Sequence, residues 1–338
     1  MSTLASIILA AGKGTRMKSD KAKVTFSLAG KSLVQRVVET SLKSECNKIC
    51  VIVGYKKEDV MNCIPPHKSL EYCEQTEQLG TGHAVKMAEE NFKNCEGEVF
   101  ILCGDVPLLK PETLEKMLES HHNNKAFCTV LTMILDDPGK YGRMIRDKNN
   151  QIHKIVEFKD ASEEQRQVKE VNSGIYCFDI QALFKALQKI NNNNEQHEYY
   201  LTDVLEIFYN ENKRIDAIVL DDVSEAAGVN SQEQLAELEC EFNNRINNHW
   251  LNNGVVIENP ATVIISEDAI IENDVTIQAG TVIRGNSVIK KNSIIRVNCY
   301  LEDANILNNC ILKGYNIVID KQLESGTILN WQEKQINE

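Results

Sequence analysis

The chain has 338 residues, of which 42% are hydrophobic and 25% charged, a composition typical of a globular protein of roughly two domains. Its net charge of −12 argues against a nucleic-acid-binding surface, because basic patches supply most of that affinity. No apolar run reaches the roughly 20 residues of a membrane span. The start lacks a basic region and the eleven cysteines form no C-x-x-C pair, so we expect a cytoplasmic protein with reduced thiols.

Up to about residue 229, short β-rich runs alternate with amphipathic stretches. This alternation predicts a Rossmann-like α/β domain with a mostly parallel sheet, in which ligands bind beyond the carboxyl ends of the strands. The predicted strands are Ser6–Ala10, Lys48–Val53, Val99–Cys103, Phe127–Ile134 and Gly174–Phe178, and the predicted helices are Ser32–Lys43, Thr81–Asn91, Pro111–His121 and Asp179–Lys189.

The first predicted strand runs directly into a glycine-rich loop. Gly12 and Gly14 follow the apolar residues, and Arg16 and Lys23 come soon after. Glycines let main-chain N–H groups approach a phosphate, and basic side chains balance the charge that develops when a phosphoanhydride breaks. The glycines are too close together for a P-loop, and a methionine stands where the dinucleotide fingerprint needs its third glycine. A plain strand-to-helix turn is the weaker interpretation.

A second motif precedes the predicted helix that begins near residue 81. Gln75 and Gln78 carry amides, which offer both donors and an acceptor and therefore suit a base edge. Gly80 and Thr81 open the helix and place N–H groups near a ligand, although Thr81 also fits a simple helix cap. We expect His83 to be structural, because no partner nucleophile stands beside it.

The third motif is Gly104-Asp105, at the end of the apolar run that starts at Val99. A carboxylate at the carboxyl end of a buried strand, beside a phosphate site, is suited to bind Mg²⁺. The alternative is an aspartate that caps the turn before Pro107.

The last third of the chain has a different pattern of hydrophobic residues. Asn191–Asn194 predicts a loop, and Gln232–Leu251 predicts an amphipathic connecting helix. Beyond Gly254, aliphatic residues recur with a strict period of six, and this repeat becomes less regular after Leu307. The pattern predicts a β-helix of hexapeptide repeats. These residues are Ile265, Ile271, Ile277, Ile283, Ile289, Ile295, Leu301 and Leu307. They resemble the left-handed β-helix of hexapeptide-repeat transferases, which commonly form trimers, so a homotrimer is expected.

The glycine loop L-A-A-G-K-G-T-R-M and Lys23 resemble the signature of sugar-1-phosphate nucleotidyltransferases. Later segments resemble, in order and spacing, the sugar-binding segments of the bifunctional N-acetylglucosamine-1-phosphate uridyltransferase/glucosamine-1-phosphate acetyltransferase (GlmU) family. They are Tyr141–Arg143, Val156–Asp160, Val171–Ile175, Glu198–Asp203 and Gly228–Asn230. The resemblance is dense from Leu4 to about Gly254. It implies Mg-dependent transfer of uridylyl from UTP to N-acetylglucosamine 1-phosphate, a step in peptidoglycan precursor biosynthesis.

The resemblance also implies roles for individual residues. Arg16 and Lys23 would be catalytic, facing the triphosphate and stabilising the departing pyrophosphate. The implied nucleotide-binding residues are Leu9, Ala10, Ala11, Gly12, Gly14, Thr15, Lys23, Gln75, Gln78, Gly80, Thr81, Cys103, Gly104 and Asp105; the sugar-binding residues are Gly142, Glu157, Asn172, Tyr200, Thr202 and Asn230; and the Mg²⁺ ligands are Asp105 and Asn230. Cys103 stands where this family most often has tyrosine.

The expected organisation is a nucleotidyltransferase domain over 1–229, a linker helix over 230–253, a short β-helix over 254–330 and a tail over 331–338. The family's acetyltransferase site uses a histidine in later coils, and residues 314–338 contain none. We therefore expect uridylyl transfer without acetyl transfer, the acetylation step being supplied by another protein. The alternatives are a nucleotidyltransferase for glucose 1-phosphate or dTTP, a non-catalytic nucleotide-sugar sensor, and a β-helix acyltransferase with an extra domain.

Overall fold

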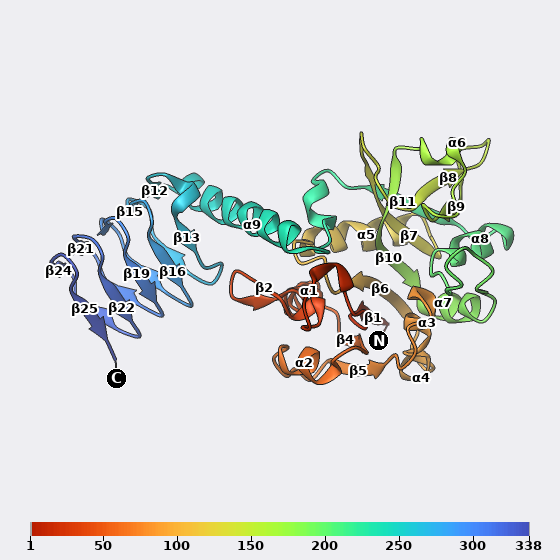
Figure 1. The fold of residues 1–338 in the computed structure, drawn as a ribbon, viewed down its shortest axis with the longest axis horizontal. Helices are drawn as coiled ribbons and strands as arrows, with labels where there is room; N and C mark the ends of the chain where they lie inside the picture. The colour runs from red at the N-terminus through yellow and green to blue at the C-terminus, as the bar shows by residue number, and fades with distance from the viewer. Residues whose placement is uncertain (1, 338) are drawn as a thin grey trace. The chain divides into compact units, whose positions relative to one another are not determined.

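The computed structural model describes residues 2–337 (Figure 1). The chain divides between Leu235 and Ala236 into two compact units, called unit 1 and unit 2 in chain order. No helix among the described residues is both long and apolar enough to cross a membrane.

Unit 1 is built on one nine-stranded sheet, which confirms the predicted α/β class with mostly parallel strands. Its main strand order is β11-β7-β10-β6-β1-β4-β5, and β8 and β9 extend from β10. Within this sheet, the antiparallel pairs are β10 with β6, β7 and β8, and β8 with β9. The strands are β1 (Thr3–Leu9), β4 (Lys48–Val53), β5 (Leu70–Glu74), β6 (Gly97–Cys103), β7 (Cys128–Ile134), β8 (Arg143–Arg146), β9 (Ile152–Val156), β10 (Glu170–Asp179) and β11 (Ile215–Val219).

Helices cover both faces of this sheet, because successive residues of the central strands are apolar on both sides. Ile7 of β1 joins a core with residues of α3, α4, α7 and α8, whereas Ile8 joins a second core with residues of α1, α2 and α5. The helices of unit 1 are α1 (Leu33–Lys43), α2 (Lys57–Asn62), α3 (Thr81–Lys86), α4 (Glu89–Phe92), α5 (Pro111–Asn123), α6 (Glu163–Arg166), α7 (Ile180–Leu187) and α8 (Asp203–Asn210).

The prediction of a single helix over Thr81–Asn91 is wrong, because α3 ends at Lys86 and α4 begins at Glu89. Val85, Ala88 and Phe92 are nevertheless all buried, so the break keeps one apolar stripe against the core. The strands β2 (Ser27–Leu28) and β3 (Lys31–Ser32) form a separate two-stranded ribbon before α1.

Unit 2 is a three-sided β-helix in which every strand pairs in parallel with the strand one coil later. This arrangement confirms the predicted hexapeptide-repeat fold. Its three sheets have the orders β12-β15-β18-β21-β24, β13-β16-β19-β22-β25 and β14-β17-β20-β23. The strands are β12 (Val256–Ile257), β13 (Ile264–Ile265), β14 (Ile270–Ile271), β15 (Thr276–Ile277), β16 (Val282–Arg284), β17 (Val288–Ile289), β18 (Ile294–Ile295), β19 (Tyr300–Glu302), β20 (Asn305–Ile306), β21 (Ile311–Leu312), β22 (Ile317–Ile319), β23 (Gln322–Leu323), β24 (Ile328–Leu329) and β25 (Lys334–Ile336).

The predicted register of the repeats is wrong at one position. The aliphatic residues from Ile265 to Leu301 are buried as expected, but the next isoleucine or leucine that is buried is Ile306 and not Leu307. Ile306 pairs with Ile289, so the corner after β19 is one residue shorter than a strict period requires. The stack then continues regularly, and β25 extends it beyond residue 330, where the sequence suggested an end.

The helix α9 (Gln232–Asn252) crosses the boundary between the units and matches the predicted connecting helix. Within unit 2, Ile246 and Trp250 pack against the interior of the β-helix. Asn247 is 1% exposed, and its side-chain amide donates to the main-chain carbonyls of Pro260 and Val263 at 2.9 and 3.0 Å. The last turns of α9 therefore close the first end of the β-helix.

Candidate active site

The glycine-rich loop follows β1 at the carboxyl end of the parallel strands. Ala10 N–H donates to the carbonyl of Ile52 at 2.9 Å, so the sheet's hydrogen bonding continues into the loop. Gly14 has a φ of +66°, and a Cβ atom on it would lie 2.5 Å from Cβ of Lys23. Glycine is needed there because it lets the loop fold back against Lys23. Gly12, by contrast, has no other atom within 4 Å of a Cβ position.

A cleft of about 230 Å³ opens beside this loop. The amide nitrogen of Gln78 reaches across to the carbonyl of Ala11 at 2.9 Å. Gln75 is buried, and its amide nitrogen contacts the Gly80 carbonyl and Nδ1 of His83, both at 3.1 Å. His83 thus orients Gln75, in the structural role expected for it. The cleft is lined by Leu9, Ala11, Gly12, Gln75, Gln78, Gly80, Thr81, Ala84 and Glu198, all predicted to bind nucleotide except Ala84 and Glu198.

Four polar side chains from distant parts of the sequence form one cluster near the ends of β1 and β6. The Lys23 ammonium contacts the Asp105 carboxylate and donates to Oδ1 of Asn230 at 3.0 Å. The Arg16 guanidinium donates to the same oxygen at 2.7 Å. Val229 N–H donates to the main-chain carbonyl of Asp105 at 2.9 Å, which holds the two segments together. The structure therefore joins the two residues predicted to be catalytic to the two predicted to bind Mg²⁺.

The oxygens of this cluster fit a divalent cation. Oxygens of Asp105 and Asn230 both reach the Lys23 ammonium, so they converge on a point where positive charge is already held. Such oxygens are the ligands Mg²⁺ prefers, and it is usually held by one or two carboxylates plus waters and substrate phosphates. Within residues 2–337 no group of three or more His, Cys, Asp or Glu side chains is arranged to hold a metal.

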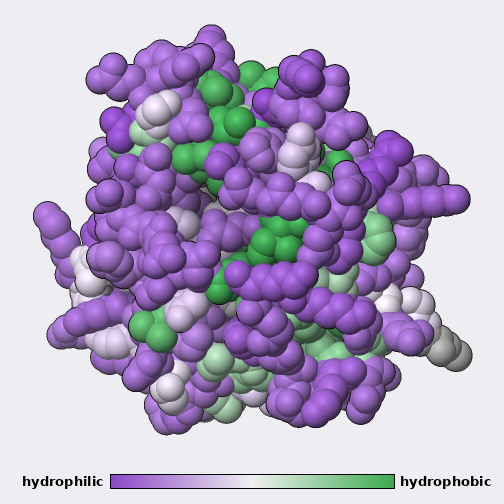
Figure 2. Space-filling view, turned by 90° about the vertical axis from the view of Figure 1, so that its right-hand side faces the viewer, coloured by the Kyte–Doolittle hydropathy of each residue, from purple (hydrophilic) through white to green (hydrophobic). Residues whose placement is uncertain are grey.

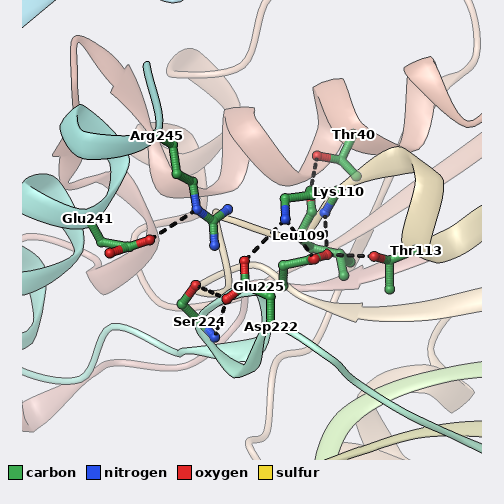
Figure 3. Close-up of polar contacts among 9 residues, drawn as sticks. All are labelled: Thr40, Leu109, Lys110, Thr113, Asp222, Ser224, Glu225, Glu241 and Arg245. Carbon is green, nitrogen blue, oxygen red and sulfur yellow. Dashed lines mark hydrogen bonds and ion pairs between the residues drawn. The ribbon is translucent and has the colours of Figure 1, made fainter. Parts of the chain in front are cut away.

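A buried carboxylate anchors the segment that leads to Asn230. Glu225 is 4% exposed and lies in the 3-10 turn Val223–Ala226. It accepts from the Thr113 hydroxyl at 2.6 Å and from the main-chain N–H and the ammonium of Lys110 at 3.2 and 3.0 Å (Figure 3). Lys110 is the N-cap of α5 and Thr113 lies in its first turn, so these bonds tie the 3-10 turn to a core helix and fix the path of the chain toward Asn230.

The residues predicted to bind sugar lie around β8, β9 and β10. The main-chain N–H of Asn172 donates to the Gly142 carbonyl at 2.9 Å, and its side-chain amide donates to the Tyr176 hydroxyl at 2.7 Å. A Cβ atom on Gly142 would lie 3.5 Å from both carboxylate oxygens of Glu157. Thr202 donates to the same carboxylate at 3.4 Å. Gly142, Glu157, Asn172 and Thr202 are therefore neighbours.

The two remaining residues predicted for the sugar have other hydrogen-bond partners. The Tyr200 hydroxyl accepts from the Gln196 amide at 2.8 Å and donates to Asp160 at 3.3 Å. Asn230 belongs to the cluster with Arg16 and Lys23. The structure thus places Asn230 where its predicted role as a metal ligand is geometrically simpler than a role in sugar binding.

The electrostatics differ between the two sides of the site. Burial raises the pKa of Glu157, helped by the neighbouring carboxylates of Asp160 and Asp203. Burial also raises the pKa of Asp203 to about 6, with further contributions from Glu206 and Asp160. Around the residues predicted to bind sugar, burial therefore shifts these two carboxyl groups toward the protonated form relative to exposed carboxyl groups. Burial, with the nearby Asp105 carboxylate, raises the pKa of Cys103 to about 12, so its thiol is protonated at neutral pH.

Two contacts connect the residues predicted to bind nucleotide with those predicted to bind sugar. The hydroxyl of Thr81 accepts from the N–H of Leu201 at 3.1 Å, beside Thr202. Sγ of Cys103 lies 3.5 Å from the carbonyl of Gly174, two residues after Asn172. Glu198 and Ala84 were not predicted from sequence, although each belongs to a segment singled out there. Ala84 lies one helical turn after Thr81, and that spacing would have indicated it.

A larger cleft of about 900 Å³ lies away from this site, between the β8–β9 turn and residues 209–217. It reaches Ile215 at the start of β11, an edge strand of the sheet, whereas the glycine loop follows the interior strand β1. Two of its cations have acidic partners, since Arg146 binds Glu170 at 2.9 Å and Lys213 binds Glu211 at 2.8 Å, and Arg214 donates to the side-chain oxygen of Asn124 at 3.0 Å. Size alone therefore does not make this cleft the candidate site, and the converging side chains favour the smaller cleft beside the glycine loop.

The face of the molecule in Figure 2 is mainly hydrophilic, with hydrophobic residues in a few small groups. Small scattered groups of this kind are normal on a soluble surface and do not indicate a docking site. The converging polar side chains remain the feature that distinguishes unit 1.

Comparison with known proteins agrees with this geometry. Residues 5–276 match the family model described as Nucleotidyl transferase. The bifunctional protein GlmU of Shouchella clausii is 45% identical over 269 residues, which cover 80% of this chain and 59% of that protein. GlmU of Bacillus subtilis is 44% identical over 264 residues, covering 78% of this chain and 58% of that protein. The chain thus spans less than two thirds of the length of these relatives.

Among solved structures, UDP-glucose pyrophosphorylase complexed with UDP-glucose shares the fold with a TM-score of 0.58 at 20% identity. That likeness covers 72% of this chain and all of the other. The matched family region contains the glycine loop, the cleft and the Lys23–Asp105–Asn230 cluster. The chain belongs to the nucleotidyl transferase family.

Proposed function

We propose that this protein transfers uridylyl from UTP to N-acetylglucosamine 1-phosphate, giving UDP-N-acetylglucosamine and pyrophosphate. The observation that carries the proposal is the cleft beside the glycine loop together with the adjoining cluster of Arg16, Lys23, Asp105 and Asn230. The identity of 45% to a GlmU protein supports the choice of substrates. The product fits a role in peptidoglycan precursor synthesis in the cytoplasm.

The proposed reaction needs no general base from the protein. A phosphomonoester has a second pKa of about 6, so the attacking sugar phosphate is mostly a dianion at neutral pH. One of its oxygens bonds to the α-phosphorus of UTP while the bond from that phosphorus to the bridging oxygen breaks. Arg16 and Lys23 then neutralise the charge on the departing pyrophosphate, and the loop N–H groups orient it.

Asp105 and Asn230 are the residues that would hold Mg²⁺, as the convergence of their oxygens supports. Bound there, the ion supplies charge neutralisation and orientation at the triphosphate. The paired amides Gln75 and Gln78 would read the uracil edge, because the contacts to Gly80, His83 and Ala11 fix their orientation.

We assign the sugar to Gly142, Glu157, Asn172 and Thr202, the group of neighbours beyond Cys103. The raised pKa of Glu157 suits a carboxyl group that forms a hydrogen bond with a sugar hydroxyl. Tyr200 lies at the border of this group of residues, where its hydroxyl donates a hydrogen bond to Asp160.

For unit 2 we propose assembly and no acetyl transfer. Residues 254–338 contain no histidine, and several aliphatic side chains point outward, among them Ile264, Ile270 and Ile328 at 40%, 57% and 52% exposure. Outward aliphatic residues along a β-helix suit packing against other copies of the chain. Incubation with acetyl coenzyme A and glucosamine 1-phosphate should release no coenzyme A.

A matrix of substrates tests the proposed specificity. Pyrophosphate release is measured for UTP and dTTP, each with N-acetylglucosamine 1-phosphate and with glucose 1-phosphate. We expect the highest kcat/KM for UTP with the N-acetylated sugar, by about tenfold or more, because polar groups built for one ligand are left unpaired by another. Equal or higher kcat/KM for another pair would assign the site to the corresponding nucleotidyltransferase.

A further inference from the structure

Arg143 is a buried cation outside the groups assigned to substrates. It opens β8, is 2% exposed, and pairs with both β9 and β10 through Val156 and Val171. Burying a guanidinium is costly unless its N–H groups are satisfied. The groups that accept hydrogen bonds from these N–H groups therefore indicate the role of Arg143.

The acceptors of Arg143 are main-chain carbonyls from two segments. Its Nε donates to the carbonyl of Arg166 at 3.2 Å. Its terminal nitrogens donate to the carbonyls of Gly139 at 2.9 Å, Pro138 at 3.4 Å and Tyr141. One guanidinium thus gathers three carbonyls of the loop 138–141 and the carboxyl end of α6. Only the planar fork of arginine offers enough fixed donors for this arrangement.

An aromatic ring joins a third segment to the same group. The guanidinium carbon of Arg143 lies 5.6 Å from the ring centre of Phe158, and that of Arg166 lies 4.7 Å from it. Nε of Arg166 also donates to the Phe158 carbonyl at 3.3 Å. The ring is therefore bound by two cations, each attracted to its π face. We call Arg143, Phe158 and Arg166 the arginine clamp.

The clamp borders two of the residues assigned to the sugar. Gly142 directly follows the gathered loop, and Glu157 directly precedes Phe158. Gly142 is also held from its other side, where its carbonyl accepts from Asn172 N–H at 2.9 Å. A Cβ atom added to Gly142 would lie 3.0 Å from the side chain of Ile155, so there is little space for a side chain at this position.

We infer that Arg143 is a positioning residue for the sugar phosphate: through the arginine clamp it sets the distance between Gly142 and Glu157 without touching substrate. This inference rests on the proposed function, because the sugar assignment defines the ligand. Residues that hold binding groups in place typically change affinity or activity by about 10–100-fold when altered. Because the clamp borders the sugar side only, the effect falls on the sugar phosphate and not on the nucleotide.

The test compares Arg143→Lys with Arg146→Met, a control on the same strand whose partner is Glu170. Lysine keeps the charge but cannot serve four carbonyls. We expect Arg143→Lys to raise KM for N-acetylglucosamine 1-phosphate about tenfold while KM for UTP changes less than about twofold. Arg146→Met should leave both unchanged. Unchanged KM for the sugar phosphate, or equal shifts for both substrates, would overturn the inference.

Hydrogen exchange without substrate separates this inference from the proposed function. Arg143→Lys should speed amide exchange in peptides covering 138–142 and 157–166 but not in β1 or β6. If the unaltered protein makes no UDP-N-acetylglucosamine, the proposed function fails, and the exchange measurement still decides whether the clamp orders these segments. If Arg143→Lys does not fold, Phe158→Leu carries the same two tests, since it removes the ring and leaves the carbonyl partners of Arg143.

Discussion

Lys23 holds the place in the cluster that a metal ion would need. Its ammonium contacts Asp105 and Asn230, the two residues whose oxygens converge. A cation and an ammonium group compete for the same oxygens, so the binding of one weakens the binding of the other. Under the proposed function, Lys23 would therefore compete with Mg²⁺ in the free protein and contact the triphosphate during the reaction.

Replacing Lys23 by methionine separates these two effects. Lys23→Met should bind Mn²⁺ several-fold more tightly in the absence of nucleotide, as measured by electron paramagnetic resonance. It should also lower kcat by about 100-fold or more, because the charge on departing pyrophosphate loses its partner. Asp105→Asn should weaken Mn²⁺ binding, and the exposed Lys21→Met is the control. Unchanged or weaker Mn²⁺ binding in Lys23→Met would contradict the competition.

Asp203 provides a pH-dependent test on the sugar side. Its pKa is raised from 3.8 to about 6, mainly by burial, so the folded protein holds this proton more tightly than the unfolded chain does. The resulting stabilisation is complete below about pH 4 and is lost as the pH rises through about 6. Asp203→Asn should therefore raise Tm at pH 8 by about 2–4 °C and change it little at pH 4.

The control for this measurement is Asp136→Asn. The Lys169 ammonium lowers the pKa of Asp136, and that carboxylate is fully exposed. Calorimetry of Asp136→Asn should therefore show no gain in Tm at pH 8. An Asp203→Asn variant with the same Tm difference at both pH values would refute the pH linkage assigned to Asp203.

At the scale of elements, the turn Val223–Ala226 is held by Glu225 on the start of α5. Glu225→Ala removes the acceptor of the buried Thr113 hydroxyl, which should lower the free energy of unfolding by about 1–3 kcal/mol. It should also lower kcat/KM by about tenfold, because Asn230 follows this turn. Lys169→Met, which breaks an exposed ion pair with Asp136, should change stability by less than about 0.5 kcal/mol.

Denaturant unfolding and pyrophosphate release measure the two effects of Glu225→Ala on one preparation. The loss of stability without a loss of kcat/KM would show that the turn supports the fold but does not position Asn230. In that case the link between this anchor and the site would be withdrawn.

Sequence patterns predict the elements whose burial is regular and miss those whose burial is not. β1, β4 and β6 have continuous apolar runs and are predicted, whereas β11 has no fully buried residue and carries no such signal. The buried position shifts from Leu307 to Ile306 because the turn after β19 is one residue shorter, and a strict sequence period cannot predict such a change in turn length.

The candidate site shows the same division. Lys23 and Asp105 stand beside strand ends and glycines, so their chemistry is visible in the sequence, and the structure places them in contact. Arg143 was recognised only as part of a motif, because its partners are main-chain carbonyls that have no residue-specific signal. Glu198 lines the cleft through a long loop whose path depends on the tertiary fold.

At the scale of the whole molecule, the outward aliphatic residues of the β-helix predict assembly. Light scattering after gel filtration should give a mass near three times the 38.1 kDa of the chain. Ile270→Glu, which places a charge at a residue that is 57% exposed in the single chain, should shift the mass toward one chain. The control is Lys334→Glu, which changes an exposed residue that is already polar. A single-chain mass for the unaltered protein would contradict assembly and leave the proposed reaction untouched.

The measurement that most directly tests the central claim is the identity of the product. The protein is incubated with UTP and N-acetylglucosamine 1-phosphate, with Mg²⁺ or with excess chelator, and the products are identified by mass spectrometry. Our account predicts equal amounts of UDP-N-acetylglucosamine and pyrophosphate with Mg²⁺, and neither above the rate without protein when the metal is removed. Absence of UDP-N-acetylglucosamine with Mg²⁺ present would contradict the claim that the Lys23–Asp105–Asn230 cluster and its cleft form a uridylyltransferase site.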